Sequence, residues 1–295
     1  EYLYVYNYCD GSLHDEDDAD HGLVADTEVA MDGTFIPYYI DSWTGEVTQV
    51  ANYRWEDGKT VFDLTLDYGD IALYGFEAVE NEPEHVVASD LDTYVTDNGI
   101  VARANPSGTY ETALAYGRKM KSTVEVPASY DITNWDITVE AWTGGDILVR
   151  EDSFVDSLGN RSVENCYDTV KTKINVKLDK LTTWDNIPEV GKDVSGRGEY
   201  KATFNWDASK ADGAYIDFGT LVNGMTVKIN GVQTKDINQN NPVLDAGAYL
   251  VDGENTIEIS YGSTLTNQMI AIGKVKPGNA SWGGYVKDYR SYGPA

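Results

Sequence analysis

Apolar and polar residues alternate with a period of two over many short stretches of this chain. Tyrosines occupy every second position of residues 2–8, which indicates one strand with an aromatic face. In residues 200–205, Tyr, Ala and Phe alternate with polar residues, and residues 257–261 repeat the pattern. This period is typical of half-buried β-strands. No stretch keeps a helical period beyond two turns, so the pattern predicts an all-β chain.

Turn residues separate the expected strands at intervals that suit packed sheets. Asn230-Gly231 follows an apolar run and is the strongest short hairpin signal in the chain. Further turns are expected at residues 105–108 and 253–255. Strands are expected, among others, at residues 23–30, 35–40, 93–101, 110–116, 122–126 and 171–178. Short strands at this spacing indicate β-sandwiches.

A domain boundary is expected near residue 128, where Pro127 and Ala128 make a plausible linker. The chain is long enough for two all-β domains, so we expect β-sandwiches at residues 1–128 and 129–295. In the second domain, residues 143–165 are acidic and contain glycine, and we expect them to form an insertion or long loop.

The second domain carries motifs that resemble a known fold. Its SGRGEYKATF, GAYIDFG, VKING and GENTIEI segments follow the order seen in galactose-binding-like jelly rolls, which are appended to many glycoside hydrolases. The segment LTTWDNIPEVGKDVSGRGEY at residues 181–200 and the ending SYGPA are similar to the C-terminal region of the α-L-rhamnosidases of glycoside hydrolase family 106. The DSWTGE turn at residues 41–46 looks like part of the small β-sandwich that follows the catalytic barrel in such enzymes.

The resemblance implies a non-catalytic C-terminal accessory region of an extracellular glycoside hydrolase, which supports or extends carbohydrate binding. Its implied partners are an oligo- or polysaccharide and the catalytic barrel upstream in the same protein. The chain starts at Glu1 inside an expected strand, so we expect a fragment of a longer protein. Because one fold hosts many functions, two alternatives stay open. They are a stand-alone carbohydrate-binding module and a cell-surface adhesion or structural module without a sugar ligand.

The charge balance narrows the classes of partner. The chain has 49 acids against 22 bases, a formal net charge of -27. This argues against nucleic acid and anionic membrane surfaces, because no basic cluster is present to neutralise phosphates. No stretch approaches the roughly 18 apolar residues that a membrane helix needs, so no membrane insertion is expected. The composition fits a protein that is secreted or displayed on a cell surface.

An acidic segment and two cysteines raise the questions of a metal site and a disulfide bond. The acidic segment at residues 14–21 offers carboxylates that can hold calcium, although it lacks the ordered spacing of a known calcium loop. The expected ligands are Asp15, Asp17, Asp18 and Asp20. The alternatives are a solvated acidic loop or, with His14 and His21, a transition-metal site. The resemblance also implies a structural calcium, since jelly rolls of this class often hold one. Cys9 and Cys166 lie in different expected domains, and a disulfide and two free thiols both stay possible.

No residue of the chain matches a catalytic motif. The sequence shows no alternation of strands and helices that would build a barrel, no G-x-S-x-G, no H-E-x-x-H and no phosphate loop. Acid pairs alone decide nothing, because 49 acids place some pair at glycosidase spacing by chance. We therefore assign no catalytic residue to this chain, and enzymatic activity is left open.

Carbohydrate binding needs an exposed aromatic ring and nearby amides or hydroxyls. The candidate residues are Trp282, Tyr285, Asn240 and Asn241, the last two in a polar loop that also contains Asn238 and Gln239. The alternatives are that Trp282 is a core or interdomain anchor and that the Asn-rich loop is an ordinary turn before Pro242. Trp43 is expected to be a packed turn aromatic, the alternative being a platform for a sugar ring, and Trp142 and Trp184 are expected to be buried.

Overall fold

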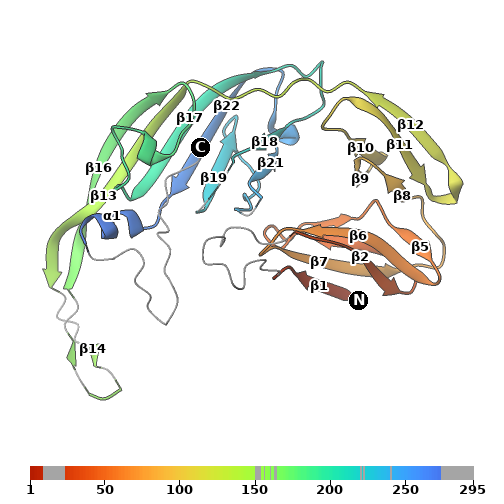
Figure 1. Cartoon of the computed structure of the whole chain (residues 1–295), viewed down its shortest axis with the longest axis horizontal. Helices are drawn as coiled ribbons and strands as arrows, with labels where there is room; N and C mark the ends of the chain where they lie inside the picture. The colour runs from red at the N-terminus through yellow and green to blue at the C-terminus, as the bar shows by residue number, and fades with distance from the viewer. Residues whose placement is uncertain are drawn as a thin grey trace. The chain divides into compact units, whose positions relative to one another are not determined.

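The structure is a computed structural model that describes residues 1–8, 24–149, 154–155, 157–159, 161–162, 165–219, 221, 223–239 and 241–273. It is all-β, with antiparallel ladders and, among the described residues, one short α-helix, α1 (Thr266–Ala271). The chain divides into two compact units, Glu1–Ser129 and Tyr130–Ala295 (Figure 1). None of the helical segments in the described ranges is long and apolar enough to cross a membrane.

The first unit opens with two sheets that share one core. A four-stranded sheet has the order β1-β7-β3-β4, and a three-stranded sheet has the order β2-β6-β5. Their strands are β1 (Tyr2–Tyr6), β2 (Ala25–Asp32), β3 (Phe35–Ile40), β4 (Val47–Gln49), β5 (Arg54–Glu56), β6 (Lys59–Leu66) and β7 (Ile71–Ala78). Alternate residues of β6 and β7 are buried together, and Leu3 and Val5 of β1 pack against them. The alternation seen in the sequence therefore points one face of each strand into this core.

The rest of the first unit consists of a three-stranded sheet of order β12-β11-β8 and a β9–β10 hairpin. Its strands are β8 (Val86–Ser89), β9 (Asp92–Thr96), β10 (Gly99–Arg103), β11 (Gly108–Leu114) and β12 (Lys119–Val124).

A short backbone ladder joins this part of the unit to the first sandwich. The Tyr53 N–H donates to the Val86 carbonyl at 2.9 Å, and the Val86 N–H donates to the Ala51 carbonyl at 2.8 Å. The rings of Tyr53 and His85 stack at 4.0 Å between centroids, and both side chains are fully buried. Burial raises the pKa of the Tyr53 hydroxyl, so it stays protonated. These contacts hold β8 beside the segment that leads into β5.

The second unit is built on a six-stranded sheet of order β16-β13-β17-β22-β19-β20, with a separate β18–β21 pair. Its strands are β13 (Trp135–Val149), β14 (Phe154–Val155), β15 (Arg161–Ser162), β16 (Asn165–Leu178), β17 (Gly196–Trp206), β18 (Tyr215–Asp217), β19 (Met225–Ile229), β20 (Val232–Gln233), β21 (Val243–Asp245) and β22 (Gly253–Gly262). Trp135, Ile137, Val139 and Ala141 are buried on one face of β13, as their alternation predicts.

The core of the second unit gathers around Trp184. This side chain is fully buried, and its indole Nε1–H donates to the Tyr200 hydroxyl at 2.6 Å. The ring of Tyr261 meets it edge-on at 5.7 Å. The expectation that Trp184 is buried is confirmed, whereas Trp142 is half-buried and lies beneath the ammonium group of Lys171 at 5.0 Å.

Two expectations about strand boundaries were wrong. Residues 143–149 form the end of β13 and pair with β16, so they are strand rather than loop. A register shift between Gly144 and Ile147 lets the ladder pass the glycines that suggested a loop. Residues 93–101, expected as one strand, form the β9–β10 hairpin, with Thr96 opposite Gly99 and Gly99 at φ +110°.

The expectation that Trp43 is packed was also wrong. It lies in the turn between β3 and β4, and its side chain is 58% exposed. The Asp41 carboxylate accepts hydrogen bonds from the Trp43 and Thr44 backbone N–H groups at 2.8 and 3.0 Å. The turn is therefore held by the Asp41 carboxylate, and the indole ring remains outside the core.

Candidate functional site

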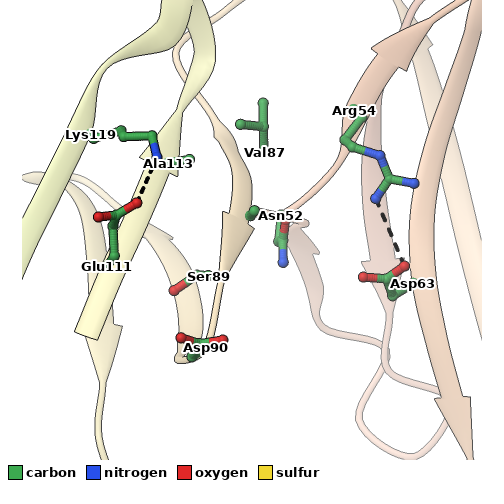
Figure 2. Close-up of a pocket in the computed structure, with 10 residues that line it drawn as sticks. Asn52, Arg54, Asp63, Val87, Ser89, Asp90, Glu111, Ala113 and Lys119 are labelled. Atoms are coloured by element: carbon green, nitrogen blue, oxygen red, sulfur yellow. Dashed lines mark hydrogen bonds and ion pairs between the residues drawn. The ribbon is translucent and has the colours of Figure 1, made fainter. Parts of the chain in front are cut away.

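A polar cleft lies within the first unit, where β5 and β6 face β8, β11 and β12. Its volume is about 300 Å³, at the lower end of small-molecule sites. Figure 2 shows Arg54 and Asp63 on one side and Glu111 and Lys119 on the other. The residues that line it are Asn52, Arg54, Asp63, Val87, Ala88, Ser89, Asp90, Glu111, Ala113 and Lys119.

One wall of the cleft is organised by Arg54. Glu28 of β2 and Asp63 of β6 lie directly opposite each other in the sheet, an arrangement in which two carboxylates repel. The guanidinium of Arg54 hydrogen-bonds to Glu28 and lies 3.9 Å from Asp63. The hydrogen bond to Glu28 raises the pKa of Arg54 above its usual value. The wall therefore combines one fixed cation with an excess of acceptor oxygens.

The opposite wall carries an ion pair between neighbouring strands. Lys119 of β12 donates from Nζ to the Glu111 carboxylate of β11 at 2.7 Å. This hydrogen bond lowers the pKa of Glu111 and raises the pKa of Lys119. Both side chains are largely exposed, so the pair adds little to stability. Its effect on the cleft is to hold a carboxylate and an ammonium group side by side on this wall.

Ser89 lies between the two sides of the cleft and is held by short contacts (Figure 2). Its hydroxyl lies 3.0 Å from the Thr112 hydroxyl and accepts a hydrogen bond from the Leu91 backbone N–H at 3.1 Å. Asn52 comes from the neighbouring segment, which pairs with Val86 through an isolated bridge. These contacts place amide and hydroxyl groups between the two charged walls.

The cleft gathers carboxylate, amide, hydroxyl and ammonium groups. Glycoside hydrolysis requires a carboxyl group that holds a proton for the leaving oxygen. The hydrogen bond from Lys119 lowers the pKa of Glu111, so this carboxyl group is less suited to carry such a proton. Paired carboxylates, an amide and an ammonium can instead accept and donate hydrogen bonds to a small polyhydroxylated ligand.

Most of the residues predicted from sequence to bind ligands lie outside the described residues. This applies to Trp282, Tyr285 and Asn240, and to the acidic residues Asp15, Asp17, Asp18 and Asp20. Asn241 is described and exposed, and its carbonyl accepts a hydrogen bond from the Val243 N–H at 2.8 Å. Among the residues that the structure describes, no group of three or more His, Cys, Asp or Glu could hold a metal ion. Because the other seven residues lie outside the described ranges, both predicted sites stay predictions.

Sequence reasoning missed the cleft because its residues come from five separate strands, from the segment before β5 and from the turn after β8. Each wall residue lies on a strand face that alternation identifies only as polar and solvent-facing. The sequence carries one usable signal, the run of charges at Arg54, Glu56 and Lys59, but that run does not indicate what lies opposite.

Comparison with solved structures finds a similar fold in a rhamnosidase from Novosphingobium sp. PP1Y. The two match with a TM-score of 0.50 at 16% sequence identity. The match covers 99% of this chain and 20% of that chain, so this chain spans about a fifth of the length of the rhamnosidase. No protein-family model matches this chain, and no curated protein matches it either. At this identity the likeness shows a shared fold.

Proposed function

We propose that this chain is a non-catalytic accessory region of an extracellular glycoside hydrolase related to the α-L-rhamnosidases, and that it supports or extends carbohydrate binding. The observation that carries the proposal is the fold match, which extends over 99% of this chain but only 20% of the rhamnosidase. Sequence motifs point the same way, since the segments from residue 181 onward resemble the C-terminal region of that family.

The described residues supply physical support for binding rather than turnover. The cleft of the first unit offers amide, hydroxyl, carboxylate and ammonium groups over about 300 Å³. The Glu111 carboxylate in it accepts a hydrogen bond from Lys119 at 2.7 Å, which lowers its pKa and makes it a weaker candidate for a general acid. The proposal includes the second unit as a galactose-binding-like domain. It also includes two partners, a carbohydrate and a catalytic domain upstream in the same protein.

The purified chain is expected to bind carbohydrate without hydrolysing glycosides. Hydrolysis is measured with p-nitrophenyl α-L-rhamnopyranoside and a panel of other aryl glycosides, and binding by affinity gel electrophoresis in neutral polysaccharides with calcium present. Release of nitrophenol above the buffer rate overturns the non-catalytic role. A chain that neither hydrolyses nor binds would support the adhesion or structural alternative. A Trp282→Ala variant in the same gels tests the predicted site of Trp282, Tyr285, Asn240 and Asn241.

Calcium binding by the acidic segment stays a prediction with its own test. A cation that binds only the folded chain stabilises it by mass action, so millimolar calcium is expected to raise the melting temperature by about 3 °C or more. An Asp17→Asn/Asp18→Asn variant should lose most of this shift, and magnesium serves as the control cation. An unchanged melting temperature in millimolar calcium contradicts the prediction.

A further inference from the structure

The outer face of the four-stranded sheet in the first unit is aromatic and open to solvent. β1 is an edge strand, and its alternate side chains Leu3 and Val5 pack inward against the core. Tyr2, Tyr4 and Tyr6 therefore point outward, and they are 79%, 62% and 46% exposed. Single exposed apolar residues are ordinary on a surface, but a contiguous row of rings indicates an interaction site.

The row extends beyond β1 into the next turn. Tyr8 is 70% exposed, and its ring centroid lies 5.8 Å from that of Tyr6 and 6.3 Å from that of Tyr68. Both pairs are tilted, by 39° and 40°, rather than stacked face to face. We call the five rings of Tyr2, Tyr4, Tyr6, Tyr8 and Tyr68 the tyrosine row. From Tyr2 to Tyr8 the chain spans about 20 Å at strand geometry, which is longer than one sugar ring.

The neighbouring strand leaves the row uncovered. Tyr2, Tyr4 and Tyr6 lie opposite Gly75, Leu73 and Ile71 of β7. At Gly75, a side-chain β-carbon would lie 3.7 Å from the Tyr2 ring and 3.7 Å from Ile40. Because glycine has no side chain, nothing projects from this position beside the Tyr2 ring. The surface is an exposed strip of rings beside small and aliphatic groups, and it is not a closed pocket.

The charges around the row select a neutral ligand. The four strands of this sheet contain no Lys or Arg, and their one acid is Glu77, which accepts a hydrogen bond from the Tyr38 hydroxyl at 2.8 Å. The charged residues beside the row in sequence are also acids, Glu1 next to Tyr2 and Asp67 and Asp70 around Tyr68. With a chain charge of -27, anionic polymers are repelled, and so is a second copy of the chain. A ligand for this surface must therefore have apolar faces for the rings, hydroxyls for the phenol groups, and no negative charge.

We propose that the tyrosine row binds a segment of neutral polysaccharide by stacking its rings on the C–H faces of successive sugars. This inference rests on the proposed function and adds to it a surface and a ligand class. Pyranose rings combine an apolar face with an equatorial rim of hydroxyls, which matches rings that each carry one phenol group. The open strip suits a chain of several sugars rather than a single sugar.

The test compares Tyr4→Ala/Tyr6→Ala with the unmodified chain in affinity gels that contain xylan, galactomannan, soluble β-glucan or, as the anionic arm, polygalacturonate. The double variant is expected to bind at least one neutral polysaccharide about tenfold more weakly, because two stacking rings are lost. Tyr4→Phe/Tyr6→Phe keeps the rings and should bind within about twofold of the unmodified chain. Trp43→Ala removes an exposed aromatic near the opposite edge of the same sheet and should leave binding unchanged.

The outcomes separate this inference from the proposed function. If the unmodified chain binds and Tyr4→Ala/Tyr6→Ala binds equally well, the tyrosine row is overturned while carbohydrate binding stands. Loss of binding only in Trp43→Ala or Trp282→Ala overturns the tyrosine row in the same way. Binding of polygalacturonate alone, or a dimer in light scattering that Tyr4→Ala/Tyr6→Ala abolishes, also overturns it. Equal melting temperatures of the variants establish that the comparison concerns binding, because the removed side chains lie outside the core.

Discussion

Replacement of Trp184 with alanine is expected to destabilise the second unit by about 3–5 kcal/mol, the range for loss of a large buried aromatic. The side chain is 0% exposed, and its removal leaves a cavity under β17 and β22. The Tyr200 hydroxyl also loses the indole donor at 2.6 Å, and Tyr261 loses its edge contact. Removal of the donor adds to the cost, because the hydroxyl group is itself buried.

Two further variants identify the cause of this loss. Trp184→Phe retains most of the ring volume but not the hydrogen bond, so a cost of about 1–2 kcal/mol is expected. Trp142→Ala removes the same residue type from a half-buried position beside Lys171, and it should cost about 1 kcal/mol. Urea unfolding followed by far-ultraviolet circular dichroism measures all three. A Trp184→Ala variant within about 1 kcal/mol of the unmodified chain contradicts this account of the core.

The period of two along the chain was a sound guide to the fold because each strand must place alternate residues in a core. It correctly located β1, and the Asn230-Gly231 turn signal correctly located the β19–β20 hairpin. In that hairpin Asn230 and Gly231 adopt φ values of +52° and +78°, as a two-residue turn of this kind requires. Strand alternation and a two-residue turn depend only on residues that are close together in the chain, so they can be predicted from the sequence.

The wrong predictions arose where the local amino-acid composition suggested one structure and contacts with distant segments produced another. Glycines and acids at residues 143–149 suggested a loop, but the ladder to β16 continues past them through a register shift. The exposed Trp43 was misjudged because apolar side chains in turns are usually packed, whereas its turn is fixed by Asp41. The cleft could not be predicted, since β5 and β11 come together through contacts between distant segments, among them those of Tyr53 with Val86 and His85.

The SGRGEY motif, which carries much of the family resemblance, has a packing explanation in the second unit. Ser195 is fully buried, and its hydroxyl accepts a hydrogen bond from the Gln268 backbone N–H at 3.0 Å. A β-carbon at Gly198 would lie 2.7 Å from the Tyr200 ring and 3.0 Å from the Trp184 ring. The glycine at position 198 is therefore explained by the room that the Trp184 and Tyr200 rings require. The motif does not by itself indicate a ligand site.

Gly196→Ala is expected to destabilise the second unit by about 3 kcal/mol, because overpacking against backbone cannot be relieved by rotating a side chain. Gly196 has φ +150°, and a β-carbon there would lie 1.9 Å from the Glu140 carbonyl oxygen. Glu140 lies in β13, which pairs with β17 at this point, so the two strands must separate to admit a methyl group. Gly196 is also held from both sides by Ser263, through hydrogen bonds of 2.8 and 2.9 Å.

Gly262→Ala is the matched control for this substitution. Gly262 lies opposite Arg197 in the β17–β22 ladder, and an added β-carbon would meet nothing within 4 Å. Its replacement should therefore change stability by no more than about 0.5 kcal/mol. Equal urea midpoints for the two variants would mean that β13 and β17 can move apart at little cost. A large loss confined to Gly196→Ala would instead establish that the first glycine of the motif serves the close approach of these two strands.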